Sequence, residues 1–202
     1  MKELNCDLHI VGGALTGLLT AYCASRLRFK IIISEKKNII LNNKKSITDT
    51  RTTAISEGSK IFLNSQGLWK NIKGFAEPIK NIKVVDTSAN SNIDFYNPVP
   101  KSNLGYIVKN SQLISLLVNE LKKKNNVRFF TGEKINSISQ KNKNIISFSK
   151  AKKIKSKLII AADGKNSAVR QMLGTNIFKK KYNERALVIN FFHERPDNNT
   201  AY

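Results

Sequence analysis

The fold of this chain is decided by the stretch Asp7-Leu8-His9-Ile10-Val11-Gly12-Gly13-Ala14-Leu15-Thr16-Gly17. Its first five residues form a short, mostly apolar run suited to a buried strand, and a glycine-rich turn follows directly. Residues 18–27 then favour a helix, and Ile31-Ile32-Ile33-Ser34-Glu35 predicts a second strand that ends in a carboxylate. The order of strand, glycine turn, helix and strand predicts a Rossmann-like α/β fold.

A glycine turn in this position is the part of such a fold that binds a dinucleotide. The first glycine permits the tight turn, small residues let the backbone approach a pyrophosphate, and the helix presents unpaired N–H groups to that anion. The carboxylate of Glu35 is placed to accept hydrogen bonds from a ribose diol and to repel a 2′-phosphate. The motif therefore favours FAD or NAD over NADP. The candidate binding residues of this motif are Gly12, Gly13, Ala14, Gly17 and Glu35.

One position departs from the usual fingerprint, because Ala14 stands where a second glycine is expected. Its Cβ lies where the backbone should come closest to the phosphates, so we expect it to lower the affinity. The alternative for the whole motif is a doubly wound domain with a glycine turn and no nucleotide.

The composition is strongly basic, with 35 Lys+Arg against 14 Asp+Glu and a net charge of +21 over 202 residues. This charge invites a nucleic-acid-binding interpretation, which stays open as an alternative. Against it, most of the positive charge is lysine, which reads bases and phosphates less well than arginine. The lysines are also scattered, and asparagine and isoleucine are abundant too, as a general compositional drift would produce. The charge predicts weak adhesion to anionic surfaces, including membranes.

The two cysteines, Cys6 and Cys23, have no metal or redox spacing and imply no disulfide framework, so we expect no metal site and a cytoplasmic location. Residues 8–24 are uncharged and resemble a signal-peptide core, but acidic residues in front and glycines within favour the nucleotide fold. No other stretch approaches the length of a membrane span.

The rest of the chain alternates strand and helix patterns, except for a β-rich middle that suggests a second domain. Residues 36–50 are polar and suggest a loop. Residues 53–55 then lead into Ser56, the N-cap of a helix at 59–65 that Gly67 ends. The further expected elements are strands at 82–86 and 93–96, a return of the chain at 107–108, an amphipathic helix capped by Asn110 or Ser111, a strand at 127–130, a hairpin of 135–139 and 145–148, a strand at 158–162, a helix at 167–173 and a strand at 186–193.

A second motif follows the expected strand at 158–162. The strand ends in Asp163-Gly164, and Asn166-Ser167 then opens a helix that carries Arg170. An Asp-Gly pair at a strand end is often only a turn. Paired with the N-terminal fingerprint, it indicates the second element of a flavin site.

Taken together, these motifs resemble class A flavoprotein monooxygenases of the p-hydroxybenzoate hydroxylase fold, and more closely the ubiquinone-biosynthesis hydroxylases. The segments that carry the resemblance are the fingerprint Gly12–Gly17 with Glu35, the run Asp49–Ser56 continuing to Gly67-Leu68-Trp69, the run Gly105–Asn110, the run Ala162–Arg170, and a final match of Ala186-Leu187-Val188, His193-Glu194-Arg195-Pro196 and Thr200-Ala201-Tyr202. The Gly-Leu-Trp and His-Glu-Arg-Pro runs are the most specific to the ubiquinone branch.

The resemblance implies a role for each matching residue. The glycine turn would cradle the FAD pyrophosphate, and Glu35 would hold the adenosine ribose. Arg51 would reach the cofactor with its guanidinium, and Asn110 would lie against the flavin or cap a helix. Asp163 and Gly164 would lie by the ribityl and pyrophosphate groups, with Arg170 supporting their loop. The alternatives for Arg51 and Arg170 are ordinary surface arginines.

The resemblance also implies the chemistry. FAD would supply it, with NAD(P)H as a transient reductant and oxygen as co-substrate, and an aromatic precursor of ubiquinone with a polyprenyl tail would be hydroxylated. The protein would hold the ring and exclude water, so no catalytic nucleophile or triad is nominated. His9 and His193 are expected to be structural. Association with a ubiquinone-biosynthesis complex, or peripherally with the inner face of the membrane, would follow from such a substrate.

The implied domain organisation is discontinuous, with an FAD-binding domain at 1–74 and 106–176 and a partial β-rich substrate domain at 75–105 and 177–202. Family members are longer, and a later Gly-Asp-Ala segment completes their flavin pocket. The expectation is therefore an N-terminal fragment or a natural truncation. The rival hypotheses are a non-catalytic FAD-binding remnant and a different FAD-dependent oxidoreductase, such as a geranylgeranyl reductase or halogenase.

Overall fold

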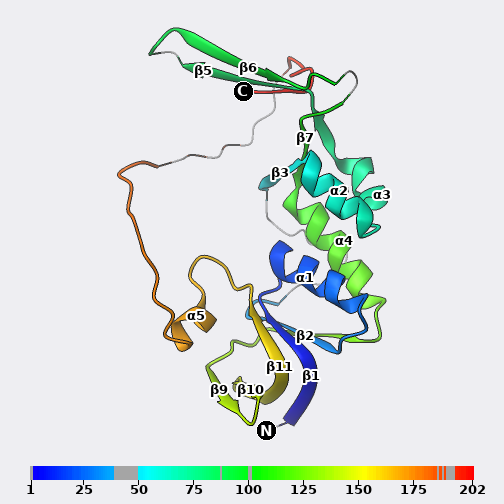
Figure 1. The fold of residues 1–202 in the computed structure, drawn as a ribbon, viewed down its shortest axis with the longest axis vertical. Helices are drawn as coiled ribbons and strands as arrows, with labels where there is room; N and C mark the ends of the chain where they lie inside the picture. The colour runs from blue at the N-terminus through cyan, green and yellow to red at the C-terminus, as the bar shows by residue number, and fades with distance from the viewer. Residues whose placement is uncertain are drawn as a thin grey trace. The chain divides into compact units, whose positions relative to one another are not determined.

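The structure is a computed structural model that describes residues 2–38, 50–86, 88–99, 102–185, 187, 189 and 194–202. It divides into two compact units, the first made of residues 1–47 and 114–183 and the second of residues 48–113 and 184–202. Figure 1 shows the elements of both units. Most of the expected loop at 36–50 and of the expected strand at 186–193, including His193, lies outside the described residues.

The first unit is built on a sheet of six strands in the order β8-β2-β1-β11-β10-β9. Four of them are parallel, namely β1 (Lys2–Val11), β2 (Ile31–Glu35), β8 (Val127–Thr131) and β11 (Lys152–Ala161). Strands β2 and β8 were predicted close to their observed positions, whereas β1 begins five residues before the expected start at 7 and β11 six residues before the expected start at 158. The parallel core confirms the α/β, Rossmann-like class that the glycine motif predicts.

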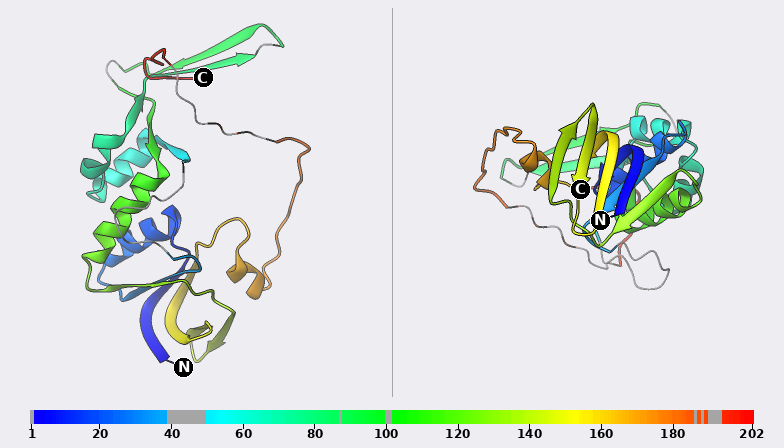
Figure 2. Two further views of the ribbon diagram at one scale, coloured as in Figure 1. Left: turned by 180° about the vertical axis from the view of Figure 1, so that it is seen from behind. Right: turned by 90° about the horizontal axis from the view of Figure 1, so that it is seen from below.

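Helix α1 (Leu15–Ser25) connects β1 to β2 and packs against both strands. Leu18 and Ala21 of this helix are fully buried, as are Ile10 of β1 and Ile33 of β2. Continuous apolar runs of this kind are typical of parallel strands covered on both faces. The right panel of Figure 2 shows the six strands with α1 and α5 (Ala168–Met172) to either side of them.

The expected hairpin is formed by β9 (Ser137–Lys141) and β10 (Asn144–Phe148), which pair antiparallel. Only Asn142 and Lys143 separate the strands, with φ of +47° and +59°. Positive φ at both loop residues is what a type I′ turn requires, and this turn matches the twist of a hairpin. The first strand begins two residues later than predicted, so Ile135 precedes it and instead packs with Val11 and Val169.

The second unit holds two three-stranded sheets, ordered β3-β7-β4 and β12-β5-β6. Their strands are β3 (Thr52–Ser56), β4 (Glu77–Ile79), β5 (Asn81–Asp86), β6 (Ser91–Tyr96), β7 (Gly105–Lys109) and β12 (Thr200–Ala201). The β-rich character predicted for the middle of the chain is confirmed. Strand β4 and the short helices α3 (Trp69–Ile72) and η1 (Lys73–Phe75) were not predicted.

Helix α2 (Glu57–Ser65) has the N-cap and the end that the sequence predicts, and it begins two residues before the expected start at 59. The hydroxyl of Ser56 accepts a hydrogen bond from the Ser59 amide at 3.2 Å, which makes it the N-cap. After the helix, Gly67 adopts φ +74°, a left-handed conformation that favours glycine. Leu68 and Trp69 pack beneath it and are both buried.

The two compact units and the predicted domains divide the chain at different places. Strands β3 and β7 and helix α2 belong to the second unit, whereas the predicted FAD-binding domain includes them. Helix α4 (Asn110–Lys122) begins in the second unit and ends in the first. The domain boundaries drawn from the resemblance stay a prediction. Among the described residues, no helix is both long enough and apolar enough to cross a membrane.

Candidate functional site

The glycine turn lies where the order of strands reverses. From β1 the chain moves outward on one side through β2 and β8, and it later returns to the other side of β1 as β11. Parallel sheets bind ligands in the crevice at the carboxyl ends of the strands on either side of such a reversal. Gly12 follows β1 directly, and Asp163-Gly164 follow β11 at the same edge. The fold thus brings the two predicted motifs together.

Two glycines of the fingerprint have no space for a side chain. A Cβ on Gly12 would overlap the carbonyl group of Ala162, and one on Gly17 would overlap the carbonyl oxygen of Gly12. Gly12 also has φ +117°, which L-residues rarely adopt. Its amide donates to the Ser34 carbonyl at 2.8 Å. The turn, the adjoining helix and the neighbouring strand are therefore in backbone-to-backbone contact.

The N-terminus of α1 meets the conditions for binding an anion. Its N-cap is Ala14, which has no side chain that could occupy the first N–H groups, and its first turn contains no acidic residue. Unsatisfied N–H groups at a helix N-terminus attract negative charge. Ala14 is exposed, with φ −90° and ψ −174°, so its backbone is unstrained. Ala14 also lines a cavity at this edge of the sheet.

The carboxylate of Glu35 is turned toward the glycine turn. One of its oxygens, Oε2, accepts a hydrogen bond from the Gly13 amide at 2.8 Å, and Oε1 accepts one from the Lys37 amide at 3.0 Å. A carboxylate offers about four lone-pair sites, so two backbone bonds leave capacity for the hydroxyls of a ribose. The structure thus joins the predicted acid to the predicted turn.

Asp163 uses its carboxylate to begin helix α5. One oxygen accepts from the Ser167 hydroxyl at 2.5 Å, and the other accepts from the Ala168 amide at 2.7 Å. Burial by itself raises the pKa of Asp163, but the hydrogen bonds from the Ser167 hydroxyl and from backbone amides outweigh it, so the pKa lies below its ordinary value. Gly164, with φ +87°, then redirects the chain.

A cavity of about 280 Å³ opens at this edge of the sheet. Of the predicted residues, it is lined by Gly12, Ala14, Glu35, Asp163 and Gly164.

The same cavity is lined by residues that were not predicted, among them Lys36, Lys134 and Ile135. The two lysines add positive charge where a diphosphate would lie. The sequence could have identified these residues, because they follow the carboxyl ends of β2 and β8, and ligand contacts in parallel sheets lie at those ends.

The remaining predicted residues, Arg51 and Asn110, lie next to each other in the second unit. The Asn110 amide donates to the Arg51 carbonyl at 3.0 Å, beyond the last pair of the β3–β7 ladder. The side chain of Asn110 is buried, and its Oδ1 accepts from the Thr53 hydroxyl at 2.5 Å. Arg51 is exposed.

A family model described as an FAD binding domain matches residues 5–200 of the chain. The chain belongs to this family of FAD-binding domains. The match spans both predicted motifs and confirms FAD as the cofactor that the sequence predicts.

Curated relatives of this FAD-binding domain include the ubiquinone hydroxylase UbiL of Rhodospirillum rubrum, 26% identical over 192 residues and covering 94% of this chain and 44% of the relative. The mitochondrial ubiquinone biosynthesis monooxygenase COQ6 of Dictyostelium discoideum is 26% identical over 212 residues, covering 93% and 43% respectively. The chain spans less than half the length of these relatives. They confirm the resemblance to ubiquinone-biosynthesis hydroxylases.

Solved structures agree on the fold. The p-nitrophenol 4-monooxygenase PnpA of Pseudomonas putida superimposes with a TM-score of 0.71 at 19% identity, over 86% of this chain and 44% of that one. The fold of a flavin monooxygenase is thereby confirmed for this FAD-binding domain.

The residues at the glycine turn fit the phosphate and ribose end of FAD. Added side chains at Gly12 and Gly17 would overlap neighbouring backbone, so the main chain lies close to the cavity. The helix N-terminus supplies uncommitted N–H groups, and Glu35 supplies an acceptor for hydroxyls.

His9, which the sequence analysis expects to be structural, is fully buried within β1. Its Nδ1 lies 2.9 Å from the Ser147 hydroxyl, and its Nε2 lies 2.8 Å from the Ser34 hydroxyl. Burial lowers the pKa of His9 to about 4, so the ring is neutral at physiological pH. Both ring nitrogens are occupied by the protein itself, as expected for a core residue.

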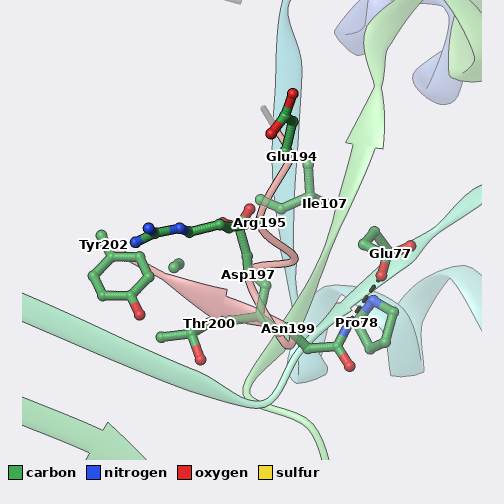
Figure 3. Close-up of a pocket in the computed structure, with 11 residues that line it drawn as sticks. Glu77, Pro78, Ile107, Glu194, Arg195, Asp197, Asn199, Thr200 and Tyr202 are labelled. Carbon is green, nitrogen blue, oxygen red and sulfur yellow. Dashed lines mark hydrogen bonds between the residues drawn. The ribbon is translucent and has the colours of Figure 1, made fainter. Parts of the chain in front are cut away.

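A larger cavity, of about 970 Å³, lies in the second unit between β4, β7 and residues 194–202 (Figure 3). Figure 3 shows the Asn199 side chain next to Glu77, and its amide donates to that carboxylate at 2.8 Å. Its lining includes Glu77, Glu194, Arg195 and Asp197, and it belongs to the second unit, whereas the glycine turn belongs to the first. The smaller cavity is lined by the glycine turn and by Ala14, the N-cap of α1, where backbone N–H groups free of a side-chain cap suit a pyrophosphate. The smaller cavity is therefore the better cofactor site.

Proposed function

We propose that this chain is the FAD-binding part of an FAD-dependent aromatic-ring monooxygenase of ubiquinone biosynthesis. The proposed substrate is an aromatic precursor that carries a polyprenyl tail, and the proposed reductant is NAD(P)H. Support comes from the names of the relatives, which include a ubiquinone hydroxylase and a ubiquinone biosynthesis monooxygenase.

The observation that carries the proposal is the hydrogen bond between the Glu35 carboxylate and the Gly13 amide. It places a ribose acceptor directly beside a phosphate-sized turn, in a cavity that the second motif also lines. These are the features that a dinucleotide needs, and a glycine turn without a nucleotide needs none of them.

In this proposal each predicted residue has a role. Gly12, Gly13, Ala14 and Gly17 offer backbone to the pyrophosphate, and Glu35 accepts from the ribose. Asp163 positions the Asp-Gly turn, so that Gly164 borders the same cavity. Arg51 would reach a phosphate of FAD with its guanidinium, and the Asn110 side chain would contact the flavin ring. The last two roles rest on the family resemblance.

FAD supplies the oxygen-activating chemistry when it is bound. The task left to this chain is binding, orientation and exclusion of water, so we nominate no catalytic residue. The proposed location is cytoplasmic, peripheral on the inner membrane face, because the proposed substrate has a tail that partitions into lipid. A ubiquinone-biosynthesis complex is a further proposed partner.

A second candidate function is an FAD-binding remnant without catalysis. It is favoured by one observation, namely that the family model matching residues 5–200 is described by FAD binding alone. The two candidates share the FAD site and differ in turnover.

The test begins with the absorption spectrum and an FAD titration of the purified protein. We expect flavin bands near one FAD per chain. Gly17→Ala should abolish binding, because its Cβ would overlap the Gly12 carbonyl oxygen. The matched control is Gly74→Ala, since a Cβ at Gly74 meets no atom within 4 Å. This control should retain wild-type affinity.

Gly17→Ala can also fail by unfolding, so a milder variant completes the test. Glu35→Gln keeps an acceptor for the Gly13 amide but removes the charge. We expect FAD affinity to fall roughly 10-fold, the usual value of a charge-assisted hydrogen bond. Glu120→Gln on α4 is its control. A folded wild-type protein that binds no FAD would refute both candidate functions. Oxidation of NAD(P)H that requires an added prenylated phenol would separate the enzyme from the remnant.

A further inference from the structure

The proposed FAD site makes no use of the segment Ile177-Phe178-Lys179-Lys180-Lys181-Tyr182, called here the basic-aromatic segment. It follows α5 as an extended trace without helix or strand, drawn in orange in Figure 1. Every residue from 173 to 185 is exposed. The segment therefore offers its side chains to the surroundings rather than to a core.

The apolar side chains of the segment are unusually exposed to solvent for their size. Phe178 is 95% exposed, Tyr182 67% and Ile177 46%. Single exposed apolar residues are common, but an aromatic pair beside an isoleucine in six consecutive residues forms a concentrated apolar surface. Aromatic residues favour the boundary between lipid headgroups and acyl chains, where the ring is buried and a hydroxyl stays wet.

The charge of the segment is uniformly positive. Lys179, Lys180 and Lys181 are consecutive, and no acidic residue occurs between positions 173 and 183. The ammonium group of Lys180 lies 5.1 Å from the ring centroid of Tyr182, so cation and aromatic ring are presented together. An anionic surface complements such a segment, because each lysine near it gains electrostatic energy.

We propose that the basic-aromatic segment docks this protein on an anionic phospholipid bilayer. The three lysines contact the headgroups, while Phe178 and Tyr182 enter the interface. The proposal rests on the membrane association proposed above and not on flavin binding. The net charge of +21 attracts the whole protein to an anionic membrane. The proposal assigns the main contact with that membrane to this one segment.

A second lysine triplet in the chain shows what distinguishes this one. Lys122, Lys123 and Lys124 come at the C-terminal end of α4, where cations are favourable. Lys123 pairs with Glu120 at 2.6 Å, and the preceding Leu121 is fully buried. The α4 triplet has the same charge but presents no aromatic side chain. It is therefore a matched control.

The first measurement compares vesicle affinities by co-sedimentation with phosphatidylcholine containing about 30% phosphatidylglycerol. Replacing Lys179–Lys181 with glutamine should weaken binding by on the order of 100-fold, since each lysine contributes about 1 kcal/mol near such a surface. The same replacement of Lys122–Lys124 should weaken it by less than about 10-fold through net charge alone. Pure phosphatidylcholine vesicles should bind weakly.

The second measurement locates the contact. The chain has one tryptophan, Trp69, which is buried. In Phe178→Trp, vesicles with brominated acyl chains should quench the added fluorescence and shift its emission to the blue. The matched control, Phe95→Trp, places the probe beside Asp94 on β6, where Phe95 is 50% exposed. Its added emission should be unaffected.

Two outcomes would overturn the proposal. Equal losses from the two lysine triplets would show that only net charge matters. Vesicle binding without quenching at position 178 would show that another part of the chain, rather than the basic-aromatic segment, contacts the lipid. FAD titration of the same variants should match the wild type, so that a failed membrane test leaves the flavin proposal unaffected.

Discussion

Gly17 occupies a point where a helix and the glycine turn touch through their backbones. A methyl group there would overlap the carbonyl oxygen of Gly12, so the position tolerates only glycine without movement of the turn. Ala14, three residues earlier, is exposed, has an unstrained backbone and lines the cavity. At the scale of single residues, therefore, one departure from the fingerprint leaves the fold intact and can alter only the affinity for phosphate.

His9 offers a prediction about pH. Its pKa is about 4 in the folded protein and near 6.5 when unfolded, so the unfolded state takes up its proton first. Stability from the neutral ring is present above pH 6.5 and is lost as the pH falls toward 4, by at most about 3 kcal/mol. Urea denaturation at a series of pH values should therefore show a decline in this window.

The decline should become shallower in His9→Gln, which cannot titrate. The matched control is His193→Gln, because His193 is the only other histidine in the sequence. It should keep the wild-type slope. If His9→Gln and wild type lose stability in parallel between pH 6.5 and 4, the buried ring does not contribute as proposed.

At the scale of elements, the short helix α5 and the β9–β10 hairpin depend on specific interactions in the turns beside them. Helix α5 has only five residues, too few to be stable alone, and begins with hydrogen bonds to Ser167 and Asp163. The hairpin of β9 and β10 depends likewise on its two-residue turn. In both cases turn chemistry decides the position of the element, and α5 contributes Ala168, Val169 and Gln171 to the lining of the cavity.

The hairpin turn carries a testable strain. Lys143 has φ +59°, which costs a lysine about 1 kcal/mol relative to glycine. Lys143→Gly should therefore stabilise the protein by about 0.5–1 kcal/mol in urea denaturation. The matched control is Lys141→Gly in β9, an exposed strand position where glycine should cost a similar amount. Equal destabilisation by both variants would rule out the type I′ turn.

At the scale of the whole molecule, the excess of lysine is a cost to stability. A net charge of +21 on 202 residues produces self-repulsion that salt screens. We expect the thermal midpoint to rise by a few degrees between about 0.02 and 0.3 M NaCl, since the Debye length falls over this range. Potassium chloride should act equally. A midpoint that stays constant or falls with salt would mean that attractive charge pairs outweigh the repulsion.

Several elements were predictable because their signals are local. The glycine turn, the strand ending in Glu35, and the Ser56 cap with its Gly67 stop were all placed correctly from neighbouring residues. Strand β4 was missed because it is three residues long and contains Pro78. Its pairing with β7, rather than any propensity, makes it a strand.

The sequence alone determined the chemistry of the cofactor site, because a glycine turn and an acid at a strand tip depend on residue type and spacing. The Asp-Gly motif was recognisable for the same reason. Arg51 and Asn110 were nominated only through family resemblance, since nothing in their local sequence marks a flavin contact.

Tertiary structure alone decided how these parts meet. The polar first halves of β1 and β11 became strands by pairing with each other, as Lys2 with Lys152 and Asn5 with Lys155. That pairing sets the reversal of strand order that brings the second motif, and Lys134, to the cavity of the first. Contacts between residues about 150 positions apart depend on packing and topology, which no local pattern encodes.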